Sequence, residues 1–594
     1  MGEPGEPGGP GEPTEAERRV WAAFRTGAEV DFTVGDPEVD DPARADDWGP
    51  ERVVRARTIV TLLLGASEAE PGHIAAVRLA GARIEGVFDV DYAELHHHLR
   101  LKNCCILERI YMYGTETRQV SLVGSHLRGG LDASLAVVEG NLRLGGCRIE
   151  GGLKLEGTRV TGALQLDGAD VVNPDGDAIF ARRAEIHGDV SCRDGFAARG
   201  GVDLRGARID GDARFEGARL RKPGGIALYA SVAEIGGLLA CDGIETEGQL
   251  RIRGTRIAGG AWFAGARLRA DGTALHAVAA HVGEDLRLTP DFTAEGGIDI
   301  SRAVVGASVR LEGAMLVNPD GPAFTGRSVT VVGDVHCYDG FTAQGPVRLN
   351  GARVNGILNF DQAVLATNGA FALTLTRATV RELDLCTENV PERVDLSHAE
   401  IGILRDRPET WPTALRLDGL RYDQLADPRP ATERLRWIER DDRSAYLPDP
   451  YEQLAAHYRR IGHDDEARFI LLARQRARRR TLPAPARIWG LLQDVVVGYG
   501  YRPWRAVAWL AGLLALGTVV FGLHHPAATG TGASPPFNPL IYSLDLLLPV
   551  IDFGVGRAYA AEGGYAWLAY FLTAAGWILA TTIAAGVGRA VSRS

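Results

Sequence analysis

The sequence predicts a mainly β fold, a parallel β-solenoid with an N-terminal helical cap, a C-terminal α-helical linker and two transmembrane helices. Three observations carry this prediction: abundant glycine, an 11-residue repeat of alternating leucines, and two long apolar segments near the C-terminus. Glycine provides 74 of the 594 residues. An excess of glycine without low complexity indicates many tight turns, because glycine adopts positive φ at little cost. We therefore expect a chain built from short repeats.

The 11-residue repeat is clearest over residues 140–171. Its members in register are Leu142, Leu153 and Leu164; Leu144, Leu155 and Leu166; Gly140, Gly151 and Gly162; and Ile149, Val160 and Val171. Apolar residues at alternate positions predict a strand with one buried face, and the flanking glycines supply the turns.

A longer period lies over the short one, since Gly176, Gly225, Gly272 and Gly321 are 49, 47 and 49 residues apart. Short strands and tight turns at a fixed pitch, without intervening helices, are typical of a parallel β-solenoid, here with two coils per 48 residues. From Arg78 to Leu425 this amounts to roughly fifteen coils and a length of ~70 Å, at ~4.8 Å per coil.

The composition divides the chain into five segments. They are a disordered leader (1–13), a helical N-terminal cap (14–77), the β-solenoid (78–425), a helical linker with an arginine-rich juxtamembrane helix (426–503) and a transmembrane hairpin (504–594). The leader is rich in Gly, Glu and Pro and has no apolar stretch, so it is neither a core segment nor a secretory signal. Thr14 with Glu17 forms a capping-box signature that opens the first cap helix. A second cap helix is expected from about Pro50 to Leu64.

Four of the seven cysteines occupy one position of the long repeat. This structural cysteine ladder is Cys192, Cys241, Cys337 and Cys386, with Thr289 at the missing step. Equivalent residues two coils apart lie ~9–10 Å apart, too far for a disulfide or a shared metal. We therefore interpret the ladder as compact apolar side chains inside the solenoid, with a redox or metal ladder as the alternative. Reduced thiols fit a cytosolic compartment.

The other candidate metal cluster is His96, His97 and His98 with Cys104 and Cys105. Adjacent residues on a strand point to opposite faces, so the three histidines cannot converge on one metal. The sequence also shows no Ser/His/Asp arrangement and no dinucleotide-binding loop between a strand and a helix. It therefore favours a non-enzymatic protein with no catalytic residue, no metal and no cofactor.

Two apolar segments, residues 506–523 and 564–587, contain 18 and 24 residues without a charge. Each is long enough to span a hydrocarbon core of ~30 Å. Nine arginines and one acidic residue lie between Arg468 and Arg505, whereas the loop 524–563 contains one arginine. The positive-inside rule then predicts a multi-pass cell-membrane protein with two spans, whose N-terminus, solenoid and C-terminus are cytoplasmic. The expected anchoring residues are Trp504, Arg505, Trp509, Trp567, Trp577 and Arg589.

The loop between the spans contains an apolar, helix-like stretch at residues 537–549. An interfacial helix that packs the hairpin is the favoured interpretation, because exposed irregular backbone is not tolerated in lipid. A re-entrant helix between two spans is also the layout of a pore module, although residues 550–554 do not match a potassium filter. In that alternative Asp545 and Asp552 are the candidate loop or pore charges.

Three strings in the tail, at residues 451–455, 498–504 and 543–549, carry a family resemblance. Together with the helical cap and the glycine-rich solenoid, they resemble actinobacterial proteins named membrane-associated oxidoreductases. Through the L-x-G-A-x-[IV] steps alone the chain is also distantly similar to pentapeptide-repeat and bactofilin solenoids. The resemblance implies membrane association and, by its name, a redox activity, but no redox residue or cofactor motif comes with it.

These observations favour a membrane-anchored cytoplasmic β-solenoid that acts as a scaffold or interaction protein. The alternatives are an oligomeric two-span pore gated by the solenoid and a membrane-associated oxidoreductase. The expected partners are a bilayer with anionic headgroups, which the arginines near the first span attract, and an unidentified protein; the pore would also need further copies of the chain. A formal net charge of -11 argues against nucleic acid.

Overall fold

A computed structural model describes residues 13–441, 446–483, 504–529, 536–548 and 551–591, together with residues 487, 491 and 494. The predicted leader therefore lies almost entirely outside the described residues. The chain divides into two compact units, Met1–Pro428 with Arg440–Asp442 and Arg429–Glu439 with Arg443–Ser594.

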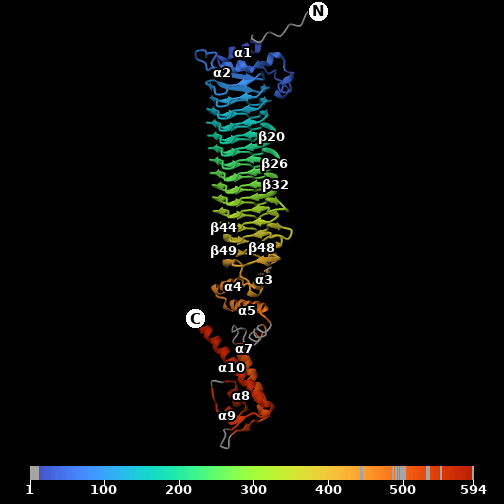
Figure 1. Cartoon of the computed structure of the whole chain (residues 1–594), viewed down its shortest axis with the longest axis vertical. Helices are drawn as coiled ribbons and strands as arrows, with labels where there is room; N and C mark the ends of the chain where they lie inside the picture. Colours follow the sequence, from blue (N-terminus) through green and yellow to red (C-terminus); the bar gives the residue numbers. More distant parts are fainter. Residues whose placement is uncertain are drawn as a thin grey trace, which may run out of the picture. The chain divides into compact units, whose positions relative to one another are not determined.

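The first unit is a parallel β-solenoid of about 15 turns with helices at its N-terminal end (Figure 1). Its strands form one sheet of 28 strands and one of 23 strands. The solenoid is confirmed, and the reason is local: each short strand buries alternate side chains and ends at a tight turn. The long strands that matter below are β20 (Asp170–Phe180), β23 (Ala197–Asp203), β26 (Arg219–Tyr229), β29 (Glu245–Arg251), β32 (Arg267–His276) and β35 (Thr293–Asp299).

Long and short coils alternate along the solenoid. The aligned residues Arg148, Asp170, Ala197, Arg219 and Glu245 are separated by 22, 27, 22 and 26 residues. Two coils therefore make up each period of 48 or 49 residues, as predicted. The extra residues of the long coils lie in β20, β26 and β32, which stack along one edge of the solenoid (Figure 1).

Glycine at one position of β29 is required by the close approach of two coils. Gly248 has φ +123°, and a Cβ on it would lie 2.5 Å from the carbonyl oxygen of Lys222 in the coil before. No side chain fits there, so β26 and β29 stay paired on both sides of the extra residues only because this residue is glycine.

The cysteine ladder occupies one buried column of the core. The column contains Leu144, Leu166, Cys192, Phe215, Cys241, Phe263, Leu288, Leu311, Cys337, Phe360 and Leu385. Two details of the prediction are wrong. The missing step is filled by Leu288 and not by Thr289, and the last one by Leu385, so that Cys386 lies one residue beyond the column. The coils differ in length, and a fixed 48-residue step therefore drifts by one residue.

The N-terminal end of the solenoid is covered by α1 (Glu15–Phe24) and α2 (Ala56–Leu63). The capping box is confirmed: Thr14 Oγ1 accepts from the Glu17 N–H at 3.2 Å, and Glu17 Oε2 accepts from the Thr14 N–H at 2.8 Å. The second helix is shorter than expected, because Pro50–Arg52 forms a 3-10 turn and Val53–Arg55 is strand β2, which pairs with β4 (Arg83–Glu85). These pairings hide the open edge of the first coil.

Glu17 also holds the cap together through a buried ion pair, and we expect its contribution to depend on pH. Burial by itself raises the pKa of this carboxyl, but hydrogen bonds from Arg55, Thr14 and Thr58 outweigh burial and lower the pKa from 4.5 to about 2. A lowered pKa stabilises the folded cap fully above pH 4.5, and this stabilisation is lost as the pH falls towards 2. Glu17→Gln should cost about 2 kcal/mol at neutral pH.

The measurement is hydrogen exchange of the α1 amides between pH 7 and pH 3, corrected for the intrinsic rate. The matched control is Glu15→Gln in the same helical turn, since Glu15 is exposed. Equal protection of α1 in the two variants would contradict the role assigned to Glu17.

The second unit is helical. Its helices are α3 (Ala431–Ile438), α4 (Asp449–Arg460), α5 (Asp464–Arg480), α7 (Trp504–Leu523), α8 (Pro539–Leu547), α9 (Val555–Ala558) and α10 (Gly564–Val591). Helices α4 and α5 form a hairpin that turns at Gly462, where φ is +82°. The C-terminal part of the predicted linker, residues 484–503, lies mostly outside the described residues.

Candidate functional site

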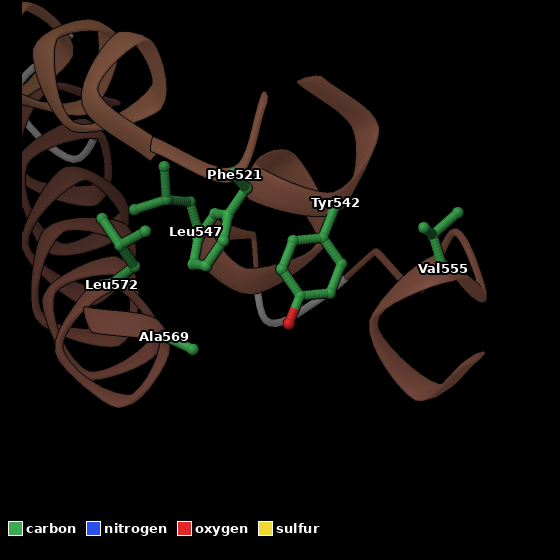
Figure 2. Close-up of a cluster of buried hydrophobic side chains, with 6 residues drawn as sticks. All are labelled: Phe521, Tyr542, Leu547, Val555, Ala569 and Leu572. Carbon is green, nitrogen blue, oxygen red and sulfur yellow. The ribbon is translucent and has the colours of Figure 1, made fainter. Parts of the chain in front are cut away.

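The candidate functional site is the apolar hairpin of α7 and α10, with α8 packed between them. Phe521 of α7 contacts Tyr542 of α8 at a ring-centroid distance of 5.0 Å and an interplanar angle of 84°. Figure 2 shows these two rings with Leu547, Val555, Ala569 and Leu572, which complete the buried cluster. The helix in the loop is thus a packing element of the hairpin.

Two glycines allow α8 to approach its neighbours closely. A Cβ on Gly576 of α10 would lie 2.2 Å from the carbonyl oxygen of Leu547, and a Cβ on Gly517 of α7 would lie 2.8 Å from Ser543 Oγ. Small residues at helix contacts are typical of packing inside membranes, where no apolar effect drives helices together.

The outward faces of α7 and α10 carry large exposed apolar side chains. They are Val507, Trp509, Leu516, Val519 and Leu523 on α7, and Tyr565, Trp567, Tyr570, Phe571, Trp577 and Ile578 on α10. A continuous apolar surface of this kind marks contact with a membrane or with another protein.

Among the described residues, one helix is long and apolar enough to cross a membrane, at Arg505–Leu523 within α7. The second predicted span coincides with α10 but does not meet the same criterion. The first eighteen residues of α10 include Gly, Tyr, Trp and Thr, which lower its hydropathy, and its side chains from residue 582 onward lie outside the described part. The structure therefore supports membrane association through α7, while the number of spans stays a prediction.

The structure describes four of the six predicted anchoring side chains. Trp509, Trp567 and Trp577 are exposed by 47, 77 and 53%. The Arg505 guanidinium donates to the carbonyl oxygen of Asp494 at 3.4 Å. The side chains of Trp504 and Arg589 lie outside the described residues. Large exposed indoles on both helices suit the interface between lipid and water.

Asp545 and Asp552, the candidate loop or pore charges, have local partners. Asp545 accepts hydrogen bonds from the N–H groups of Phe553 at 2.9 Å and Gly556 at 2.6 Å. Asp552 accepts from the Gly554 N–H and pairs with the exposed Arg557, both at 2.8 Å. Both carboxylates therefore fold the loop after α8 back onto itself, and this geometry favours a structural role over the lining of a pore.

Asp545→Ala is expected to destabilise the hairpin, because it leaves two backbone N–H groups without an acceptor. We expect a loss of about 2–3 kcal/mol. Asp552→Ala is the matched control and should cost less than about 1 kcal/mol, since its ion pair is exposed. Thermal unfolding and limited proteolysis of the detergent-purified chain measure both variants, and an equal effect of the two substitutions would contradict this assignment.

Two of the arginines before the first span are paired. Arg476 and Arg479 both contact the Asp494 carboxylate, at 3.0 and 3.2 Å, so the one acidic residue among the arginines is engaged twice. The segment keeps a net positive charge, as an anionic lipid surface would require.

The described cysteines do not have the environment of redox thiols. All seven are buried and free, and burial raises the pKa of each thiol, for example that of Cys147 to about 12. A thiol with a raised pKa is a poor nucleophile and a poor metal ligand, because both roles need the thiolate.

Sequence reasoning missed one group of potential metal ligands, in which atoms of Asp361, Asp384 and Cys386 lie within 4.8 Å of one another. An Asp-x-Cys motif could have drawn attention to it. Burial raises the pKa of the Cys386 thiol to about 12, and Asp361 already lies 3.7 Å from the Arg407 guanidinium. The group therefore fits an ion-paired surface. Of the His96–His98 run, His97 packs on the Phe24 ring at 5.0 Å, whereas His96 is exposed beside Glu94.

Comparison with known proteins provides no relative from which a function could be transferred. No protein-family model, no curated protein and no solved structure matches the chain. The function is therefore inferred from the geometry of the two units.

Proposed function

We propose that the protein is a membrane-anchored scaffold: the C-terminal hairpin holds it in a bilayer, and the β-solenoid presents a repetitive cytoplasmic surface to a protein partner. The observation that carries this proposal is the exposed apolar surface of α7 and α10. The finer parts of the proposal are two spans, a cytoplasmic solenoid and anionic headgroups around the juxtamembrane arginines.

The polar side chains of the hairpin are compatible with lipid. The hydroxyl groups of Thr518, Thr573 and Thr581 donate to the carbonyl oxygens of Leu514, Ala569 and Trp577 in their own helices, at 2.7, 3.0 and 2.8 Å. In hydrocarbon such internal hydrogen bonds are needed, because no water replaces them.

The solenoid offers an ordered outer surface. Arg219 and Arg267 contact Glu245 at 3.6 and 3.2 Å, and Arg269 contacts Glu295 at 2.6 Å, so that charged side chains on successive coils pair along one face. Repetitive surfaces of stacked coils are typical binding surfaces, because each coil contacts only its neighbours and presents its outer residues in register.

Labelling of introduced cysteines in intact cells tests the anchor and its orientation. His525→Cys lies in the loop after α7, and Asp175→Cys lies on an exposed part of the solenoid. With a membrane-impermeant thiol reagent we expect the first to react and the second to react only after lysis. The native cysteines give a low background because all are buried. Recovery of the protein from the soluble fraction, or labelling of Asp175→Cys in intact cells, would contradict the proposal.

A further inference from the structure

One face of the solenoid carries a row of arginines, which we call the arginine stripe. Its members are Arg251, Arg253, Arg302, Arg327, Arg348 and Arg377. The strand register aligns Arg251, His276, Asp299, Thr325, Arg348 and Thr374 on six successive coils, and the remaining arginines follow within three residues of this column. At ~4.8 Å per coil, the stripe is about 24 Å long.

The stripe differs from the other charged faces because its charges are not neutralised. Within the described part of the solenoid, the guanidinium groups of Arg253, Arg302, Arg327, Arg348 and Arg377 have no hydrogen bond or ion pair. Asp299 is the one carboxylate in the aligned column. By contrast, Arg269 pairs with Glu295 and Arg256 with Glu234, on the two sides of the stripe, at 2.6 and 3.5 Å. The positive potential is therefore confined to one line along the solenoid.

The surface is hollowed along this line. A groove of about 600 Å³ is lined by Arg253, Arg302 and Arg327 together with Val278, Ser301 and Ser328. Neutral hydroxyl groups between the arginines can donate to or accept from a polar chain lying in the groove.

We propose that the arginine stripe binds an extended acidic peptide. A guanidinium group holds a carboxylate through two parallel hydrogen bonds, which a lysine cannot do. Arg253, Arg302 and Arg348 lie on every second coil, ~9.6 Å apart. A polyproline II chain repeats after three residues, ~9.3 Å, so a peptide with an acidic residue at every third position brings successive carboxylates to successive arginines.

The stripe lacks a platform for nucleic-acid bases. The nearest aromatic rings are already covered by arginine: Tyr229 by Arg205 and Arg251, at 4.3 and 5.4 Å, and Phe371 by Arg393 and Arg416, at 4.4 and 4.5 Å. Single-stranded nucleic acids need exposed rings for stacking. The neutral flanks likewise favour a linear ligand over a planar lipid surface.

The chain itself contains a sequence of this chemistry. Its first thirteen residues include Gly-Glu-Pro triplets in which Glu3 and Glu6 are three residues apart and Glu12 keeps the same step. The natural ligand thus has two possible sources, the leader of this chain and an acidic segment of another protein.

The test is fluorescence anisotropy of the full-length, detergent-purified chain with two labelled probes, a peptide of residues 1–13 and octaglutamate. For Arg302→Gln with Arg327→Gln we expect about tenfold weaker binding and a smaller dependence on salt, since two exposed charge pairs are lost. The matched control is Arg118→Gln with Arg381→Gln, two exposed arginines outside the stripe that change the net charge equally; its affinity should be unchanged. Circular dichroism checks that both variants are folded.

Equal affinity of both double variants for octaglutamate would overturn the proposal, and so would stronger binding of an oligothymidine or of phosphatidylglycerol vesicles at the stripe. A third variant of the full chain, with Glu3, Glu6 and Glu12 replaced by Gln, distinguishes the two sources. If the leader occupies the stripe, this variant binds octaglutamate more tightly than the unchanged chain; unchanged affinity supports a segment of another protein as the ligand.

Discussion

Replacing Phe263 by alanine should lower the free energy of unfolding of the solenoid by about 3–5 kcal/mol. The Phe263 ring is fully buried, and in its column it lies between Cys241 and Leu288 on the adjacent coils. Its removal leaves a cavity that neither neighbour can fill, because both are held by parallel strand pairing. Each coil packs only on the coils next to it, so the damage should spread little along the solenoid.

Guanidinium unfolding of the detergent-purified chain, followed by far-ultraviolet circular dichroism, measures this loss as a shift of the transition midpoint. Val332→Ala is the matched control, because Val332 is 52% exposed and its truncation should change stability by less than about 0.5 kcal/mol. A common midpoint for the two variants would show that the column through Phe263 is not the core of the solenoid.

An arginine in place of Leu516 should remove the protein from the membrane. Leu516 lies near the middle of Arg505–Leu523 and is 47% exposed, on the outside of the hairpin. At the centre of a bilayer an arginine costs about 2.5–3.5 kcal/mol in insertion. In water the same exposed substitution would be nearly neutral, so its effect distinguishes a lipid-facing helix from a water-facing one.

Alkaline extraction of membranes gives the measurement. We expect wild-type protein and Leu516→Ala to stay in the pellet and Leu516→Arg to shift into the supernatant or to be degraded. Val332→Arg, which introduces the same charge on the solenoid surface, should remain in the pellet. Retention of Leu516→Arg at the wild-type level would argue that α7 does not cross the bilayer.

The helical cap and the solenoid could be predicted because their signals are local. The capping box of Thr14 and Glu17 needs residues only three positions apart, and alternating leucines with flanking glycines specify each coil by itself. The alternation of long and short coils was visible for the same reason, since Gly176, Gly225, Gly272 and Gly321 recur at the period of a coil pair.

The roles of individual charged residues could not be predicted in this way. Asp545 was a candidate pore charge until the chain after α8 brought Gly556, eleven residues further on, to its carboxylate. The arginine stripe is equally hidden in the sequence, because Arg253 and Arg302 are 49 residues apart. Only the stacking of coils places them on one face.

The sequence by itself determined the repeating strands, the coil period and the position of the apolar helices, because these depend on neighbouring residues and on side-chain period. The tertiary structure decided which residues stand in register, as with Leu288 and Leu385 in the core column, and which charges are neutralised. Register depends on the exact length of every coil, and the pairing of charges depends on register. Both are therefore settled only when the coils stack.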